Sequence, residues 1–308
     1  MTGKSKAAFP WVRLVILFLV LLLTLYPSNK LWRPLYPLLL GGPVLIALLV
    51  GRTERDFRLW VVYVTSFLLF FVVRIVADDL GPAAAIRYPI VADALLGGGR
   101  VPTILLQEWF YQYGSPSWFD NLILGVHLTY YFAPPAGGLL LWRFKPALLP
   151  PYLIALSATY LIGVLIHIAV PTVPPWMASQ LGDLPRVYRI VYDIWHSVSP
   201  AFYAYGYQVT GGNDVAAMPS LHTAATAIIA YAWWAAGRFW RPAGAIYLLA
   251  MIFALVYLGE HYVVDALAGM VLAWACWVWA RRRERRIRTV QALGPVDETG
   301  PIHGVPSQ

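Results

Sequence analysis

The chain has 308 residues, of which 59% are apolar and 15% aromatic, whereas only 12% are charged. This composition is typical of a membrane protein and excludes an ordinary soluble domain. The net charge of +8 could indicate nucleic-acid binding, but the basic residues cluster between apolar segments, as topology signals do, so we expect no nucleic-acid partner. The single cysteine, Cys276, excludes an intramolecular disulfide.

Eight apolar segments follow one another along the chain, and each is long enough to cross a bilayer as a helix. In chain order they are Trp11–Tyr26, Leu35–Val50, Phe57–Ala77, Phe119–Trp142, Ala147–Val170, Pro219–Ala236, Pro242–Leu258 and Tyr262–Ala280. The second segment contains two prolines and two glycines and could be re-entrant instead of spanning. We find no strand pattern, so the sequence predicts an all-α, polytopic transmembrane helical bundle.

The distribution of basic residues predicts the orientation of these segments. With the N-terminus on the inner side, 16 of the 23 lysines and arginines fall in inner segments, which is the bias of cytoplasmic loops. Both termini are then cytoplasmic in a multi-pass protein of the cell membrane. The first segment has no small-residue cleavage site after it, so we expect a retained helix and not a removed signal peptide.

Two long outer segments and a polar tail divide the chain. Residues 78–118 are predicted to form short interfacial helices, and residues 171–218 a functional loop, with a passive interfacial cover as the alternative. We expect N-terminal transmembrane helices and an outer segment over 1–118, a catalytic transmembrane domain over 119–280, and a basic tail over 281–308 that is disordered from Thr289 onward.

Two histidines are predicted at the outer ends of two apolar helices. His222 and His261 are 39 residues apart, about the length of two crossings joined by a tight turn, so both reach the same membrane face. His261 and Asp265 are spaced i, i+4 and share a helix face. A histidine that is oriented by a carboxylate can attack phosphorus through Nε2, while a second histidine protonates the leaving oxygen.

The start of the His222 helix is a predicted phosphate site. Pro219 fits the first helical turn, where its missing N–H costs nothing. The hydroxyl of Ser220 and the free backbone amides of that turn then point outward, where they could bind a phosphate.

Other polar residues are candidates for binding a head group or an acceptor, namely His127, Tyr131 and Asn213. His127 could instead be a neutral side chain hydrogen-bonded to a neighbouring helix, and we assign His167 to packing. A zinc site of His127, His222 and His261 is conceivable, but the spacings match no metal motif, so we expect no metal.

The two histidine motifs resemble those of a known family. Met218-Pro219-Ser220-Leu221-His222 and the run from Val256 to Gly269 look like the second and third signature motifs of the type 2 phosphatidic acid phosphatase superfamily. The leucine of Pro-Ser-Leu-His and the segment Pro171-Thr172-Val173-Pro174-Pro175-Trp176 resemble its inositol phosphorylceramide synthase branch. The resemblance covers Asp120 to Ala280 and implies a core of the phosphatidic acid phosphatase type 2, haloperoxidase-like fold.

This resemblance also implies a mechanism. His261 would be the nucleophile that forms a covalent phosphohistidine, Asp265 would orient it, and His222 would be the acid–base residue, with neither a metal nor an organic cofactor. The phosphatases' first motif, Lys-x6-Arg-Pro, is absent, and Leu255 stands where their third motif has arginine. We therefore expect Arg186 and Arg189 to bind the phosphate, with contact to lipid head groups as the alternative.

These features together predict a membrane enzyme that acts on a phospholipid or a polyprenyl phosphate. An alcohol acceptor would make it a lipid phosphotransferase of the inositol phosphorylceramide synthase type, and water would make it a lipid phosphate phosphatase. A lipid or ion carrier that uses the histidines as proton relays is a third hypothesis, but the chain has no half-chain repeat. The sequence indicates no oligomeric state.

Overall fold

The structure is a computed structural model that describes residues 53–199 and 214–293. Two predicted spans, Trp11–Tyr26 and Leu35–Val50, lie outside the described residues. So do the candidate Asn213 and the tail beyond Leu293.

The described residues form helices, and their only β contacts are isolated bridges from Thr172 to Ala85 and Ala216. The all-α prediction is therefore confirmed for this part of the chain. The α-helices are α3 (Glu54–Leu80), α4 (Arg87–Leu96), α5 (Pro102–Phe110), α6 (Trp118–Leu128), α7 (Ala133–Phe144), α8 (Leu149–Ala169), α9 (Pro175–Gln180), α10 (Ile190–Val198), α12 (Leu221–Ala236), α13 (Arg241–Tyr257) and α14 (Val263–Leu293). Short 3-10 turns, η2 (Thr129–Tyr131) and η3 (Pro146–Leu148), precede α7 and α8.

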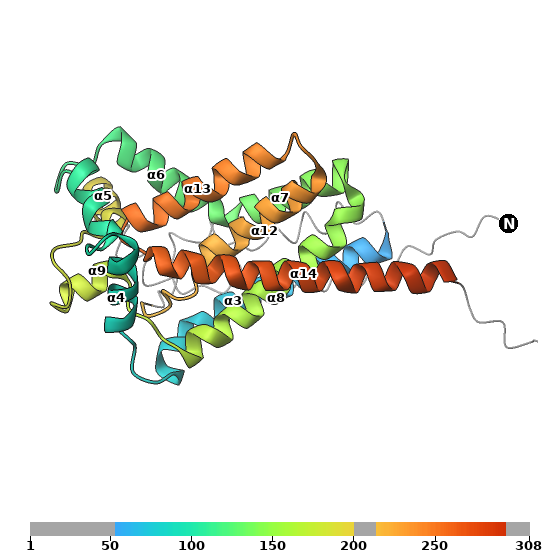
Figure 1. The fold of residues 1–308 in the computed structure, drawn as a ribbon, viewed down its shortest axis with the longest axis horizontal. Coiled ribbons are helices and arrows are strands. Elements are labelled where there is room, and N and C mark those ends of the chain that lie inside the picture. The colour runs from blue at the N-terminus through green and yellow to red at the C-terminus, as the bar shows by residue number, and fades with distance from the viewer. Residues whose placement is uncertain (1–52, 200–213, 294–308) are drawn as a thin grey trace, which may run out of the picture.

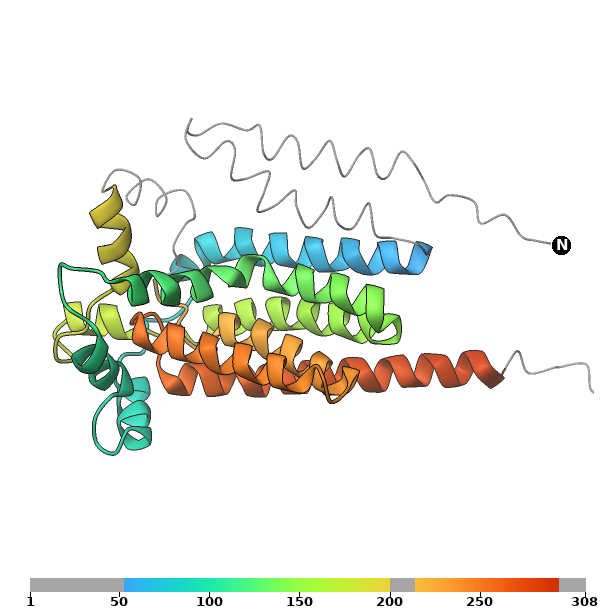
Figure 2. The same cartoon turned by 90° about the horizontal axis from the view of Figure 1, so that it is seen from above.

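The long helices lie side by side along one axis, and the short helices α4, α5 and α9 gather at one end of this bundle (Figure 1). The helix α14 extends beyond its neighbours at the opposite end, as the turned view also shows (Figure 2). The central helix α12 packs against α8, α13 and α14. Its buried face is rich in alanine, and small residues let neighbouring helices approach closely.

One glycine shows how close this approach is. A Cβ atom at Gly269 of α14 would lie 2.3 Å from the backbone oxygen of Ser220, at the start of α12. Only glycine therefore lets the second turn of α14 approach the start of α12 so closely, and the two histidine motifs lie around the starts of these two helices.

Two helical segments of the described part are long and apolar enough to cross a membrane, Pro146–Ala169 and Val263–Ala292. The helix α13 is apolar but has only 17 residues. The prediction of eight spans is therefore not confirmed, although the helical fold is.

The predicted span Phe119–Trp142 is not one helix. The helix α6 ends at Leu128, the turn η2 follows, and α7 begins at Ala133 with Pro134 and Pro135 in its first turn. Proline has no N–H to donate and clashes with the preceding turn, so two adjacent prolines start a new helix and do not continue an old one.

The helix α14 is longer than predicted. It continues through the arginine run to Leu293, so residues 281–293 are helical, and the disorder predicted from Thr289 is wrong as far as Leu293. Buried Glu284 on this extension accepts hydrogen bonds from Arg283 and from Arg55 of α3. The contact with Arg55 joins the far end of α14 to the bundle.

The helix α3 packs mainly against α8, and its side chains belong to the same apolar core as those of α8 and α12. The boundary predicted at residue 118 therefore separates α3 from helices with which it shares a core.

Candidate active site

The first histidine motif forms the start of α12. Ser220 is the N-cap residue, and its Oγ accepts a hydrogen bond from the backbone N–H of Thr223 at 3.3 Å. Pro219 precedes the cap, so the prediction that it occupies the first turn is wrong by two positions. His222 lies in that first turn. The backbone N–H of Ser220 donates to the backbone oxygen of Asp265 at 3.0 Å, which joins the two motifs.

The second motif lies in the turn between α13 and α14. His261 precedes α14 and is not its first residue. Gly259 has a φ of +80°, and a Cβ there would lie 2.6 Å from the backbone oxygen of Tyr188, so the turn requires glycine. Gln107 of α5 donates through Nε2 to the backbone oxygens of Tyr257 and Tyr188, both at 2.9 Å. This amide holds the turn against the segment that leads into α10.

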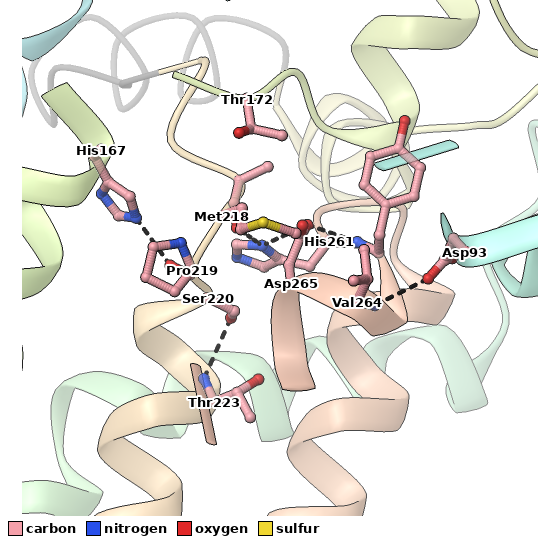
Figure 3. Close-up of polar contacts among 12 residues, drawn as sticks. Asp93, His167, Thr172, Met218, Pro219, Ser220, Thr223, His261, Val264 and Asp265 are labelled. Carbon is pink, nitrogen blue, oxygen red and sulfur yellow. Dashed lines mark hydrogen bonds and ion pairs between the residues drawn. The ribbon is translucent and has the colours of Figure 1, made fainter. Parts of the chain in front are cut away.

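The ring of buried His261 is fixed through Nδ1. This atom lies 2.9 Å from the backbone oxygen of Ala217 and 3.5 Å from Oδ2 of Asp265 (Figure 3). Both neighbours are acceptors, so a neutral imidazole carries its proton on Nδ1 and keeps the lone pair on Nε2. The structure thus places Asp265 beside His261 as predicted, but a carbonyl that the sequence did not indicate is the nearer acceptor.

Two buried carboxylates, one from α14 and one from α4, accept hydrogen bonds from backbone N–H groups at the start of α14. Oδ2 of Asp265 accepts the backbone N–H of Tyr262 at 2.8 Å, and Oδ1 of Asp93 on α4 accepts the backbone N–H of Val264 at 2.9 Å (Figure 3). Free amides and the helix dipole make a helix start favourable for negative charge. Burial raises the pKa of Asp93 to about 6, and the nearby Asp265 adds to this rise.

The motifs line a cavity of about 180 Å³ at the end of the bundle where the short helices gather. The ring centroid of His222 lies 5.6 Å from that of His261, 4.8 Å from that of His127 and 4.2 Å from that of Tyr130. Tyr131 also lines the cavity. The structure therefore brings His127 and Tyr131 to the two motif histidines.

His167 lines the cavity and also contacts the backbone of the segment before α12. Its Nε2 lies 2.8 Å from the backbone oxygen of Pro219, so it can hold the segment before α12 in place (Figure 3). The predicted packing role of His167 fits this contact.

The two arginines that were predicted to bind the phosphate, Arg186 and Arg189, lie in different places. Arg189 lines the cavity, where its side chain binds Glu260 and its guanidinium lies 4.1 Å from the ring centroid of Trp176. Arg186 lies fully exposed near Tyr188 and does not line the cavity, so the structure does not support it as a phosphate ligand. Sequence reasoning missed Arg74 of α3, which does line the cavity. Its position in an otherwise apolar stretch of α3 was the available signal.

Ser220 does not line the cavity either. It is fully buried, and its hydroxyl caps α12. Leu221 and His222 are the residues of this turn that face the cavity. The predicted phosphate contact from the Ser220 side chain is therefore not available in this geometry.

Two carboxyl groups, those of Glu260 and Asp214, also face the cavity, and their pKa values shift in opposite directions. Burial opposes the ionisation of Glu260, but the charge and hydrogen bonds of Arg189 outweigh it and lower the pKa of Glu260. Burial raises the pKa of Asp214, although the charges of Arg189 and Arg74 oppose this rise.

Among the described residues, no group of three histidine, cysteine or acidic side chains is arranged to hold a metal ion. This includes the three-histidine site of His127, His222 and His261 that the sequence made conceivable.

Residues 102–279 match the PAP2 superfamily, which is more than half of the chain. The chain belongs to this superfamily. The family that the two histidine motifs indicated is thus confirmed. PAP2 proteins are enzymes that act on lipid phosphates, and the helices long enough to cross a bilayer fit a membrane protein of this kind.

The chain is also similar to the inositol phosphorylceramide synthase catalytic subunit aur1 of Schizosaccharomyces pombe. The two are 26% identical over 255 residues, which are 77% of this chain and 56% of that protein. The chain therefore spans little more than half the length of this relative. No solved structure matches the chain.

Proposed function

We propose that this PAP2 protein is a lipid phosphotransferase that works through a covalent phosphohistidine on His261. The observation that carries the proposal is the arrangement of the two histidines. Hydrogen-bond acceptors hold Nδ1 of His261, which leaves Nε2 unprotonated, and the ring of His222 lies 5.6 Å away across the same cavity.

The reaction has two steps, and His222 acts in both. First, Nε2 of His261 attacks phosphorus, the bond from phosphorus to the lipid oxygen breaks, and His222 gives its proton to the departing alcohol. Then an acceptor hydroxyl attacks the phosphohistidine, His222 takes its proton, and the bond between phosphorus and nitrogen breaks. Asp265 and the carbonyl of Ala217 keep the His261 ring in the reactive tautomer throughout.

The charges of the cavity favour a phosphodiester substrate over a phosphomonoester. Glu260 has a lowered pKa and is paired with Arg189, so it cancels much of that arginine's positive charge. A phosphodiester carries one negative charge near neutral pH, whereas a phosphomonoester carries nearly two. A phospholipid with its head group attached suits this cavity, and an alcohol acceptor then makes the enzyme a transferase. The named activity of the relative aur1 agrees with this choice. A lipid phosphate phosphatase that uses water is the second candidate.

We place the cavity at the outer surface of the cell membrane, in a multi-pass bundle of about eight spans. Helices α5 and α6 and the segment between them expose large aromatic side chains, which suit the interface between lipid and water. They include Trp109, Tyr113 and Trp118. A lipid could then place its phosphate in the cavity while its acyl chains stay in the bilayer.

Mass spectrometry tests this function. The purified full chain is incubated with a panel of phospholipids and polyprenyl phosphates, with and without polyhydroxy alcohols such as inositol. We expect the phosphoryl-linked head group to move from a phospholipid to an alcohol, and His261→Ala to abolish this product. Release of inorganic phosphate from a phosphomonoester lipid, without transfer to any alcohol, would identify a phosphatase. No conversion of any lipid, with transport into vesicles, would identify a carrier.

A further inference from the structure

We propose that Arg74 of α3 is the cation that binds the phosphoryl oxygens of the substrate in this cavity; the proposal rests on the phosphoryl-transfer function above. Arg74 lies in the stretch Phe67–Ala77 of α3, in which every other residue is apolar. An ionisable residue in such a stretch is costly and faces a polar interior when it occurs. The side chain of Arg74 indeed lines the cavity, together with Phe70 one turn earlier.

The other cavity arginine already has an anionic partner. Arg189 binds Glu260 through Nε at 2.9 Å and through a terminal nitrogen at 3.4 Å. It also lies over the ring of Trp176. A phosphate that used Arg189 would have to compete with a carboxylate that is held at close range.

Arg74 has no ion pair within the described residues. A guanidinium that is partly removed from water at the wall of this cavity favours a bound anion, since the cost of desolvating its charge is otherwise not offset. Its five N–H donors form a planar fork that matches two oxygens of a phosphate. An anionic ligand therefore fits Arg74 better than it fits Arg189.

The position of Arg74 suits a phosphate that His261 attacks. Its charge acts on Asp214, which lines the cavity from the segment before α12. His222 and His261 line the same space. Arg74 thus lies within electrostatic reach of the place where phosphorus would lie between the two histidines.

The inference also explains how the chain functions without two expected cations. The sequence has no Lys-x6-Arg-Pro motif, and Leu255 stands at the arginine position of the third motif. The structure shows Leu255 fully buried in the apolar core, with its backbone oxygen accepting the N–H groups of Glu260 and His261. The position of Leu255 therefore lies in the apolar core and supplies no cation to the cavity. The helix α3, which lies before the region matched to the PAP2 superfamily, supplies one instead.

Binding of orthovanadate, which resembles phosphorus under attack, tests the inference without turnover. Orthovanadate is titrated calorimetrically into the purified full chain and its variants in detergent. We expect Arg74→Gln to weaken binding by about tenfold or more, and Arg74→Lys to restore part of the affinity, because lysine keeps the charge but not the fork. Arg58→Gln is the matched control, since Arg58 is an exposed arginine of the same helix, and should leave affinity unchanged.

Each outcome separates this inference from the proposed function. Weaker orthovanadate binding by Arg74→Gln supports the anion site even if no lipid in the panel donates its phosphoryl group. Equal affinity of Arg74→Gln and the unaltered protein overturns the inference even if transfer is observed, and so does absence of binding by the unaltered protein. A thermal unfolding midpoint of Arg74→Gln equal to that of the unaltered protein shows that its weaker binding does not come from misfolding.

Discussion

At His261 the proton on Nδ1 has two acceptors at different distances. The backbone oxygen of Ala217 is 2.9 Å away and Oδ2 of Asp265 is 3.5 Å away. In serine proteases a carboxylate alone sets the tautomer of the catalytic histidine, and its loss costs about 10⁴-fold. Here the carbonyl also sets the tautomer, and a side-chain substitution cannot remove it.

Asp265→Asn should therefore lower kcat by only about 10–100-fold, less than the 10⁴-fold loss of the protease case. The amide oxygen of asparagine can still accept the N–H of Tyr262, so the start of α14 should keep its structure. Initial rates of head-group transfer measure the effect. A loss of about 10⁴-fold with an unchanged unfolding midpoint would show that the carboxylate, and not the carbonyl, sets the tautomer.

The two cavity histidines should differ in their effect on the covalent intermediate. His261→Ala should abolish labelling of the protein by a phospholipid with radioactive phosphorus, because no nucleophile remains. His222→Ala should still become labelled, but about 10²–10⁴-fold more slowly, because the leaving oxygen is no longer protonated. His196→Ala is the control, since this exposed histidine on α10 stacks on Tyr192 and does not line the cavity. Normal labelling of His261→Ala would contradict the mechanism.

At the scale of elements, α4 is joined to α14 through one buried carboxylate. Asp93 accepts the N–H of Val264, and its pKa is raised from 3.8 to about 6 by burial and by the charge of Asp265. The folded state thus binds a proton more tightly than the unfolded chain does. Stability should therefore fall as the pH rises from about 4 to about 6, where Asp93 becomes charged in the folded protein.

Asp93→Asn tests this contact, because asparagine accepts the same hydrogen bond but does not ionise. The difference in thermal unfolding midpoint between the variant and the unaltered protein should shift in favour of the variant as the pH rises from 4 to 6. Asp183→Asn is a suitable control, since Asp183 is exposed. A midpoint difference that does not change with pH would mean that Asp93 keeps its ordinary pKa.

The sequence predicted the helical elements well where the pattern is local. Hydropathy located α8, α12 and α13 within a few residues, and the two histidine motifs indicated His222, His261 and Asp265. Hydropathy failed at Pro134 and Pro135, because both prolines are apolar enough to extend the segment while their geometry interrupts the helix. It also ended α14 too early, because polar arginines can continue a helix outside the apolar region.

The cavity itself was only partly predictable. Motif spacing brings His222 and His261 together, but the contribution of Arg74 depends on how α3 packs against α8, which is a long-range contact. The acceptor role of Ala217 depends on a backbone oxygen, and no residue type signals it. Arg186 and Arg189 differ by three positions in an irregular segment, so only the folded loop decides which of them enters the cavity.

At the scale of the whole molecule, the arginine run of α14 and the cavity lie at opposite ends of the bundle. The arginine run of α14 is joined to Arg55 at the start of α3 through Glu284, and Arg288 donates to the backbone oxygen of Ala147 before α8. The short helices lie at the other end (Figure 1), and Trp176 of α9 lines the cavity there. The positive-inside bias then predicts that the arginine end is cytoplasmic and that the cavity opens outward.

Cysteine labelling in intact cells with a membrane-impermeant thiol reagent tests this orientation. In a Cys276→Ser background, Ser115→Cys in the exposed segment between α5 and α6 should react without lysis. Thr289→Cys near the end of α14 should react only after lysis, because it lies among arginines that are retained on the inner side. Both positions are exposed in the structure, so a difference in labelling reports the side of the membrane and not burial. Labelling of Thr289→Cys from outside, with protection of Ser115→Cys, would reverse the orientation. The cavity would then draw its phospholipid from the inner leaflet, and its acceptor would have to be an intracellular alcohol.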